Sequence, residues 1–171
     1  NIEFKFTIFL LEGLMLIEMI IKKHQEGKEG LCVSARQCSN AADVLKKACI
    51  ERNNRFVETG EVTLTGNNGF FESFDYTSAE GVEVRGFSCG ISGFYQPENA
   101  AIAAETALCL GVDPEFIKSG IFRAKDPARF EIIRENPTVI YDGAHNKNGI
   151  CALVTCLKRY FPKWQGAGFV M

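Results

Sequence analysis

The sequence predicts an α/β fold, on three observations. A short apolar strand at 31–35 precedes a helix that starts at residue 39 or 40 and runs to about residue 53. The region from 55 to 88 is rich in strand-like alternation of apolar and polar residues. A further strand at 138–141 leads through a polar, glycine-containing turn into a helix that ends near residue 160. A strand, such a turn and a helix together form the unit of a parallel α/β sheet.

Turn and cap residues separate the remaining elements. The Asn-Asn-Gly run at 67–69 is a hairpin signal, because these residues tolerate a positive φ. Pro97 suits the first turn of a helix, where its missing N–H costs nothing, and the alanine-rich run at 99–110 continues that helix. Asp113 is placed to cap a further short helix. The first half of another strand is expected at 166–171.

The opening of the chain, residues 6–21, is strongly apolar. A membrane span is disfavoured there, because Glu12 and Glu18 would each cost a few kcal/mol at a bilayer centre. No small-residue cleavage site follows, so a secretory signal is disfavoured as well. A buried amphipathic helix is expected, within an anomalous helical segment at 1–26.

Composition indicates a globular protein. Of the 171 residues, 46% are hydrophobic and 23% are charged, which is sufficient for a core. The formal net charge is -2 with both signs mixed, so no nucleic-acid partner is expected. The seven cysteines include no C-x-x-C pair, which argues against a disulfide framework and a zinc ribbon. Buried, reduced thiols in a cytoplasmic protein are the expectation.

The turn at 142–146 is a candidate binding site on general grounds. Ligands of α/β proteins commonly bind at the carboxyl ends of strands, and this turn directly follows the strand at 138–141. A boundary near 124–128 separates the β-rich and helical part from a second domain, which begins with the new strand pattern.

Three clusters carry side chains that are useful for binding or chemistry. Taken singly, each has a local explanation. Asn99 can satisfy backbone groups in the first turn of a helix, and Arg129 can be a surface residue paired with Glu131. Asp142 and Asn146 can organise a turn and cap a helix. The clusters are GFYQPENA at 93–100, DPARFE at 126–131 and VIYDGAHN at 139–146.

In this order and spacing the clusters resemble those of the folylpolyglutamate synthase and dihydrofolate synthase family, within the Mur ligase superfamily. The family typically shows Gly-x-His-Gln-x-x-Asn-Ala, then Pro-Gly-Arg-Phe-Glu, then Asp-Gly-Ala-His-Asn. The third cluster matches fully, whereas Tyr95 stands where His is usual and Ala128 where Gly is usual. The resemblance covers about residues 28–171.

The resemblance implies which residues meet ATP. Asn99, Arg129 and Asp142 match family positions that contact the nucleotide, and Arg129 lies at the hinge between the central and C-terminal domains. Its guanidinium suits a phosphate, because it is always charged and binds bidentately. Asp142 and His145 match positions where the C-terminal domain closes over the nucleotide, with the aspartate on the ribose and the imidazole on the base.

Gln96 and Asn146 are expected to support these contacts from behind. The implied reaction begins with transfer of the γ-phosphoryl group of ATP to a folate carboxylate, and the amine of L-glutamate then attacks the acyl phosphate. Such chemistry needs Mg²⁺ and cationic groups around the transferring phosphoryl group. It also needs water to be excluded, which closure of two domains about the linker would provide.

Parts of the family pattern have no counterpart in this chain. No glycine-rich phosphate loop ending in Gly-Lys-Ser/Thr occurs, and GNNG at 66–69 is better explained as a hairpin. The metal-binding glutamate and histidine of the family would lie upstream of the opening or within it, so no metal ligand is assigned. The family's carbamylated lysine would fall on Ile17. Either the opening has diverged or it lies outside the original reading frame, and both alternatives stay open.

The fold class implied is α/β and Mur-ligase-like. Residues 1–126 would form the C-terminal part of the central ATPase domain, including its β-rich segment. Residues 127–171 would form the start of a truncated, Rossmann-like C-terminal (glutamate ligase) domain. The implied function is ATP-dependent addition of L-glutamate to a folate or tetrahydrofolate, in folate and one-carbon metabolism. The folate form and a second activity in dihydrofolate synthesis stay open.

The chain alone is expected to be inactive, because the phosphate loop and the Mg²⁺ ligands are missing from it. We expect a cytoplasmic monomer whose partners are ATP, L-glutamate and folate, with no nucleic acid and no membrane. Two alternatives remain: another amino-acid ligase of the Mur superfamily, and a non-catalytic remnant of the fold. A Rossmann-type oxidoreductase is disfavoured, because no G-x-G-x-x-G follows a strand.

Overall fold

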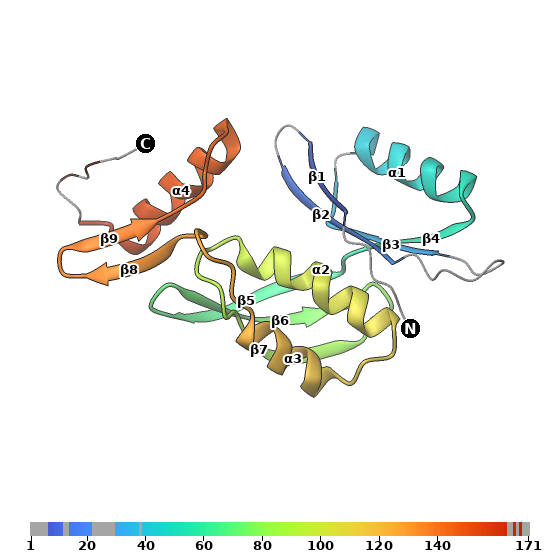
Figure 1. Ribbon diagram of the computed structural model, residues 1–171. Helices are drawn as coiled ribbons and strands as arrows, with labels where there is room; N and C mark the ends of the chain where they lie inside the picture. The colour runs from blue at the N-terminus through green and yellow to red at the C-terminus, as the bar shows by residue number, and fades with distance from the viewer. Residues whose placement is uncertain are drawn as a thin grey trace.

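Figure 1 shows the computed structural model, which contains both helices and strands. The structure describes residues 7–11, 14–21, 30–37, 39–163, 166 and 168, and for 7–11 and 14–21 it describes the backbone alone. The elements are β1 (Thr7–Leu11), β2 (Leu14–Ile21), β3 (Gly30–Ser34), α1 (Ser39–Glu51), β4 (Asn54–Glu58), β5 (Glu61–Asn68), β6 (Phe71–Thr77), β7 (Glu83–Ser88), α2 (Gln96–Cys109), α3 (Pro114–Arg123), β8 (Glu131–Glu135), β9 (Thr138–Tyr141) and α4 (Lys147–Tyr160).

The described strands form three sheets. The first has the order β1-β2-β3-β4, the second β5-β6-β7 and the third β8-β9. Strands β3 and β4 are parallel, with Cys32 opposite Phe56, and helix α1 connects them. This β3–α1–β4 unit confirms the α/β class, because parallel neighbours need a crossover connection of this kind.

The opening of the chain differs from the expected helix. Thr7–Leu11 and Leu14–Ile21 are strands that pair antiparallel as β1 and β2. A continuous apolar run has no period that distinguishes a buried strand from a helix, and its isoleucines favour the strand. The expectation of a helix over 6–21 is therefore wrong for these residues, and the rest of the segment 1–26 lies outside the described residues.

The C-terminal unit, residues 131–160, also differs from the expected parallel arrangement. Strands β8 and β9 pair antiparallel, with Glu131 opposite Tyr141. Asn136 and Pro137 alone connect them, and so short a connection allows only antiparallel pairing. Helix α4 packs on this hairpin (Figure 1). The half-strand expected at 166–171 falls almost entirely outside the described residues.

Helix α2 is rich in alanine because it packs between two sheets (Figure 1). On one side Ala101 and Ala104 join the hydrophobic core over β6 and β7. On the other side Ile102 packs against Val33 and Val57 of the first sheet. The small side chains let the backbone of the helix approach both sheets.

Local signals place the other element ends as predicted. Pro97 lies in the first turn of α2, and the side chain of Asp113 caps α3 by accepting a hydrogen bond from the N–H of Glu115 at 2.8 Å. The predicted hairpin is confirmed between β5 and β6, but Asn67 and Asn68 belong to β5 and the turn itself lies at Gly69, with φ 65°, and Phe70. Within the part of the chain that the structure describes, none of the helices has both the length and the apolar character needed to cross a membrane.

Candidate functional site

The linker at 124–130, which joins α3 to β8, forms the centre of the site. Ala128 and Phe130 both have positive φ, at 63° and 47°, a region that residues with a Cβ rarely adopt. The N–H of Ala128 donates to Oε2 of Glu131 at 2.9 Å, and its carbonyl accepts from the N–H of Gly143 at 2.8 Å. The linker at Ala128 is therefore hydrogen-bonded to the turn that follows β9.

Asp142 fastens the same linker with its side chain. Its Oδ2 accepts a hydrogen bond from the N–H of Phe130 at 2.8 Å, and its Oδ1 accepts one from the N–H of Ala144 at 2.8 Å. A single half-buried carboxylate thus joins the linker to the turn at 142–146. The local explanation considered for Asp142, that it organises this turn, is confirmed, and the contact with the linker is additional.

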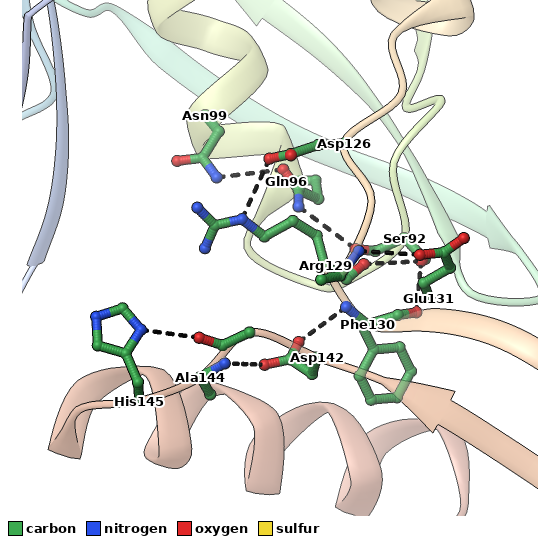
Figure 2. Close-up of polar contacts among 12 residues, drawn as sticks. Ser92, Gln96, Asn99, Asp126, Arg129, Phe130, Glu131, Asp142, Ala144 and His145 are labelled. Atoms are coloured by element: carbon green, nitrogen blue, oxygen red, sulfur yellow. Dashed lines mark hydrogen bonds and ion pairs between the residues drawn. The ribbon is translucent and has the colours of Figure 1, made fainter.

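Helix α2 reaches the linker through a chain of polar groups (Figure 2). Nδ2 of Asn99 donates to Oε1 of Gln96 at 3.2 Å, and Nε2 of Gln96 donates to the carbonyl of Ser92 at 3.4 Å. The hydroxyl of Ser92 donates to the carbonyl of Phe130 at 2.7 Å. Because the N–H of Phe130 is held by Asp142, one continuous chain of bonds connects Asn99 to Asp142. We call these five residues the junction.

Arg129 and His145 lie on the open side of the junction. In Figure 2 the guanidinium of Arg129 points away from the linker, toward the side on which Asn99 and His145 also lie. Arg129 is half-buried, and its Nε donates to the carboxylate of Asp126 at 3.1 Å. His145 is exposed, with its Nδ1 2.9 Å from the carbonyl oxygen of Gly143. A charged ligand can therefore reach the guanidinium of Arg129 and the imidazole of His145 from solvent.

Asn146 and Gln96 act within the protein. Oδ1 of Asn146 accepts from the N–H of Gly149 at 2.8 Å and so caps α4, as predicted from its place in the turn. Gln96 is buried directly behind Asn99. The structure therefore brings Gln96, Asn99, Arg129, Asp142 and His145 to one region around the linker, while Asn146 caps α4. The contacts of these residues with a nucleotide stay predictions.

Tyr95, which stands where the related motif has histidine, lies half-buried beside the junction. Burial, together with the negative charge of Asp142, raises the pKa of Tyr95 to about 12. Gly93, at φ 121°, lies against the ring, since a Cβ at that position would stand 3.3 Å from the ring carbons of Tyr95. The phenol therefore stays neutral near pH 7, whereas a histidine in its place would titrate there.

Sequence reasoning missed two contributors to the site. Ser92 is 7% exposed and supplies the hydroxyl that connects α2 to the linker, although it directly precedes the first cluster. Glu131 was considered only as a partner of Arg129, and its carboxylate accepts a hydrogen bond from the backbone of Ala128. Both act on backbone groups of the linker, which no side-chain motif reveals.

A concave region lies apart from the junction, at the carboxyl ends of β3 and β4. Its volume is about 460 Å³, and none of the predicted nucleotide contacts lines it. The lining residues are Arg36, Gln37, Glu58, Thr59, Gly60, Glu61, Thr77, Ser78 and Ala79.

The chain is similar in sequence to folylpolyglutamate synthases. It is 33% identical over 113 residues to the folylpolyglutamate synthase of Lacticaseibacillus casei. The matched stretch covers 63% of this chain and 26% of that protein. It is 35% identical over 75 residues to the dihydrofolate synthase/folylpolyglutamate synthase of Bacillus subtilis, which covers 40% of this chain and 17% of that protein. The chain thus spans about a quarter or less of the length of these relatives. No family model matches it.

Solved structures show the same similarity. A complex of FPGS with AMPPCP and folate matches with a TM-score of 0.67 and 28% identity, over 77% of this chain and 34% of that one. The folylpolyglutamate synthase of Thermotoga maritima matches with a TM-score of 0.66 and 28% identity, over 76% of this chain and 32% of that one.

The fold and the residues at the linker define this chain as a partial α/β protein of the Mur ligase type. The resemblance carried by the three clusters is confirmed by the relatives and by the structural matches. Within the superfamily, the chain is similar to part of the folylpolyglutamate synthases.

Proposed function

We propose that the protein carrying these residues is an ATP-dependent ligase that adds L-glutamate to folates, and that this part of it holds the nucleotide at the linker. The observation that carries the proposal is the junction, which brings Asn99, the linker with Arg129, and Asp142 together from separate elements. The proposal is supported by the match to a synthase whose structure was solved with AMPPCP and folate.

In this proposal Arg129 meets a phosphate of ATP. Its guanidinium is permanently charged, half-buried and directed to the open side of the junction (Figure 2), where it can form charge-assisted hydrogen bonds. Asn99 and His145 would meet the base from either side. Each carboxylate oxygen of Asp142 already accepts a backbone N–H, so a ribose hydroxyl would use a second lone pair on one of them.

The reaction itself is a phosphoryl transfer followed by an acyl transfer. The γ-phosphoryl group moves from ATP to a folate carboxylate and ADP leaves, and the amine of L-glutamate then displaces phosphate to form the amide. An acyl phosphate is lost to water unless the site is closed. The linker can contribute to closure, because Phe130 is fully buried between the C-terminal unit and the rest of the protein.

The described residues do not supply a Mg²⁺ site. Within the part of the chain covered by the structure, no group of three or more His, Cys, Asp or Glu side chains could hold a metal ion. The sequence also lacks the Gly-Lys-Ser/Thr phosphate loop. Because the sequence lacks this phosphate loop, we expect the 171-residue chain to bind ATP weakly and to make no folylpolyglutamate by itself.

The test measures ATP-dependent incorporation of labelled glutamate into tetrahydrofolate by a longer polypeptide that carries these residues. Arg129→Ala is expected to lower the apparent affinity for ATP about 10- to 100-fold, since it removes charge-assisted hydrogen bonds to phosphate. Arg134→Ala, which removes an exposed arginine of β8, is the matched control and is expected to behave as wild type. Incorporation into UDP-linked substrates in place of folate would indicate another Mur-type ligase, and no incorporation at all would indicate a non-catalytic protein.

A further inference from the structure

Strand β6 carries a glutamate at a position where its alternation calls for an apolar residue. Glu72, Phe74 and Tyr76 all lie on the buried face of β6, and Glu72 is only 1% exposed. Burying a carboxylate is unfavourable unless its charge and its lone pairs are matched. A charge at this position therefore indicates a specific contact.

The partners of Glu72 come from the end of α4, 87 residues further along the chain. Arg159 donates from Nε to Oε1 at 3.0 Å and from Nη2 to Oε2 at 3.1 Å, so both carboxylate oxygens are bound by one guanidinium. The hydroxyl of Tyr160 donates to Oε1 at 2.6 Å. Burial and the hydrogen bond to Glu72 raise the pKa of Tyr160, which keeps the phenol protonated as a donor.

Aromatic rings connect this contact to the linker. The ring of Tyr160 lies 5.6 Å from that of Phe130, centroid to centroid, and 5.5 Å from that of Phe70 in an edge-on arrangement. Phe70, at the turn between β5 and β6, also packs against Phe130 at 6.2 Å. Phe130 directly follows Arg129 and is itself part of the junction. Packed aromatic neighbours transmit a displacement, because a close-packed interior leaves them little free volume.

We propose that Glu72 is a positioning residue whose contact with Arg159 and Tyr160 fixes the C-terminal unit against β6 and thereby sets the linker that carries Arg129. The effect on the linker follows from the contacts alone. The effect on nucleotide binding rests on the function proposed above. A contact that only stabilised the fold would act on every element, whereas a positioning contact acts on the linker and on the C-terminal unit.

The first test uses amide hydrogen exchange in the 171-residue chain and needs no nucleotide. In Glu72→Gln, exchange of the Phe130 and Ala144 amides is expected to accelerate about tenfold or more, because the C-terminal unit loses its anchor. Exchange at Ala104, in the core of α2, is expected to change by less than about twofold.

Two further variants make this result decisive. Glu83→Gln breaks the exposed pair of Glu83 with Arg85 on the neighbouring strand, and as the matched control it is expected to leave exchange at Phe130 unchanged. Arg159→Lys keeps the positive charge but cannot bind both carboxylate oxygens of Glu72 in a bidentate way. Amide exchange at Phe130 is therefore expected to accelerate about threefold. This milder variant decides the question if Glu72→Gln does not fold.

The second test measures glutamate incorporation by the longer polypeptide. Glu72→Gln and Arg159→Met are each expected to raise KM for ATP about tenfold, and kcat at saturating ATP is expected to change less than about threefold. The double variant is expected to show no further rise in KM, because both substitutions remove one contact.

Two results overturn the proposal: unchanged exchange at Phe130 in Glu72→Gln, or equal acceleration at Phe130 and Ala104. A wild-type polypeptide that incorporates no glutamate refutes the proposed function instead, and the exchange measurements still decide the role of Glu72. Normal incorporation combined with unchanged exchange would refute the positioning role alone.

Discussion

The bend at Ala128 leads to a quantitative prediction: replacing this alanine with glycine should stabilise the protein. At φ 63° a residue with a Cβ is strained by about 1–2 kcal/mol, whereas glycine adopts this conformation freely. Glycine in turn adds conformational freedom to the unfolded chain, which costs about 0.5–1 kcal/mol. The difference is a gain of about 0.5–1 kcal/mol in the free energy of unfolding.

Urea unfolding, followed by circular dichroism, measures this gain. With an m-value of about 2 kcal/mol/M, Ala128→Gly should raise the midpoint by about 0.3–0.5 M without changing m. Ala103→Gly makes the same chemical change inside α2, where the backbone has right-handed helical dihedrals. This variant should lower the free energy of unfolding by about 1 kcal/mol. If both variants lose stability equally, the argument from backbone conformation at residue 128 is wrong.

Three other predictions concern buried contacts. Ser92→Ala removes the donor to the carbonyl of Phe130 and should lower the free energy of unfolding by about 1–3 kcal/mol, measured by urea unfolding. Gly60→Ala should lower it by about 2 kcal/mol or more in the same assay, because a Cβ there would stand 1.9 Å from the carbonyl oxygen of Thr77. Burial raises the pKa of Cys156 from 9.0 to about 11, so the unfolded thiol ionises first. The stability that this thiol contributes should be complete below pH 9.0 and should fall as the pH rises toward 11, and urea midpoints in Cys156→Ala should decline less over that window.

Local sequence signals predicted most of the fold. Pro97, Asp113 and Asn146 mark the starts of three helices correctly, because caps and first-turn prolines act within a few residues. The hairpin was predicted as well, and Gly69 adopts the positive φ expected of it, although Asn67 and Asn68 extend β5 and the turn lies at Gly69 and Phe70.

Two parts of the fold were not predictable in this way. The apolar opening has no periodicity, and pairing with β3 decides that β2 is a strand. The order of a strand, a turn and a helix suggested a parallel sheet at 138–160, whereas the two-residue connection before Thr138 makes the pair antiparallel. In each case the pairing with a neighbouring strand determines a secondary structure or strand direction that the segment's own sequence does not determine.

The sequence named the residues that lie around the linker, but it did not predict the hydrogen bonds between them. The three clusters supplied Asn99, Arg129 and Asp142 through a resemblance, and the structure joins them through Ser92 and the linker backbone. The alternation in β6 contained a visible signal at Glu72, because a charge stands there in an apolar series. Its partners could not be inferred, since no local rule connects residues 87 positions apart.

The chain of bonds through the linker has a consequence for how this region can change. At the linker that chain uses peptide groups, the N–H and the carbonyl of Phe130, and no side-chain atom of Arg129 belongs to it. A different side chain at position 129 would therefore alter the charge offered to a ligand while the scaffold beneath it persists. Substitutions at residue 129 would therefore remove the contact with Asp126 and change the charge offered to a ligand, while the bonds that join Asn99 to Asp142 are kept.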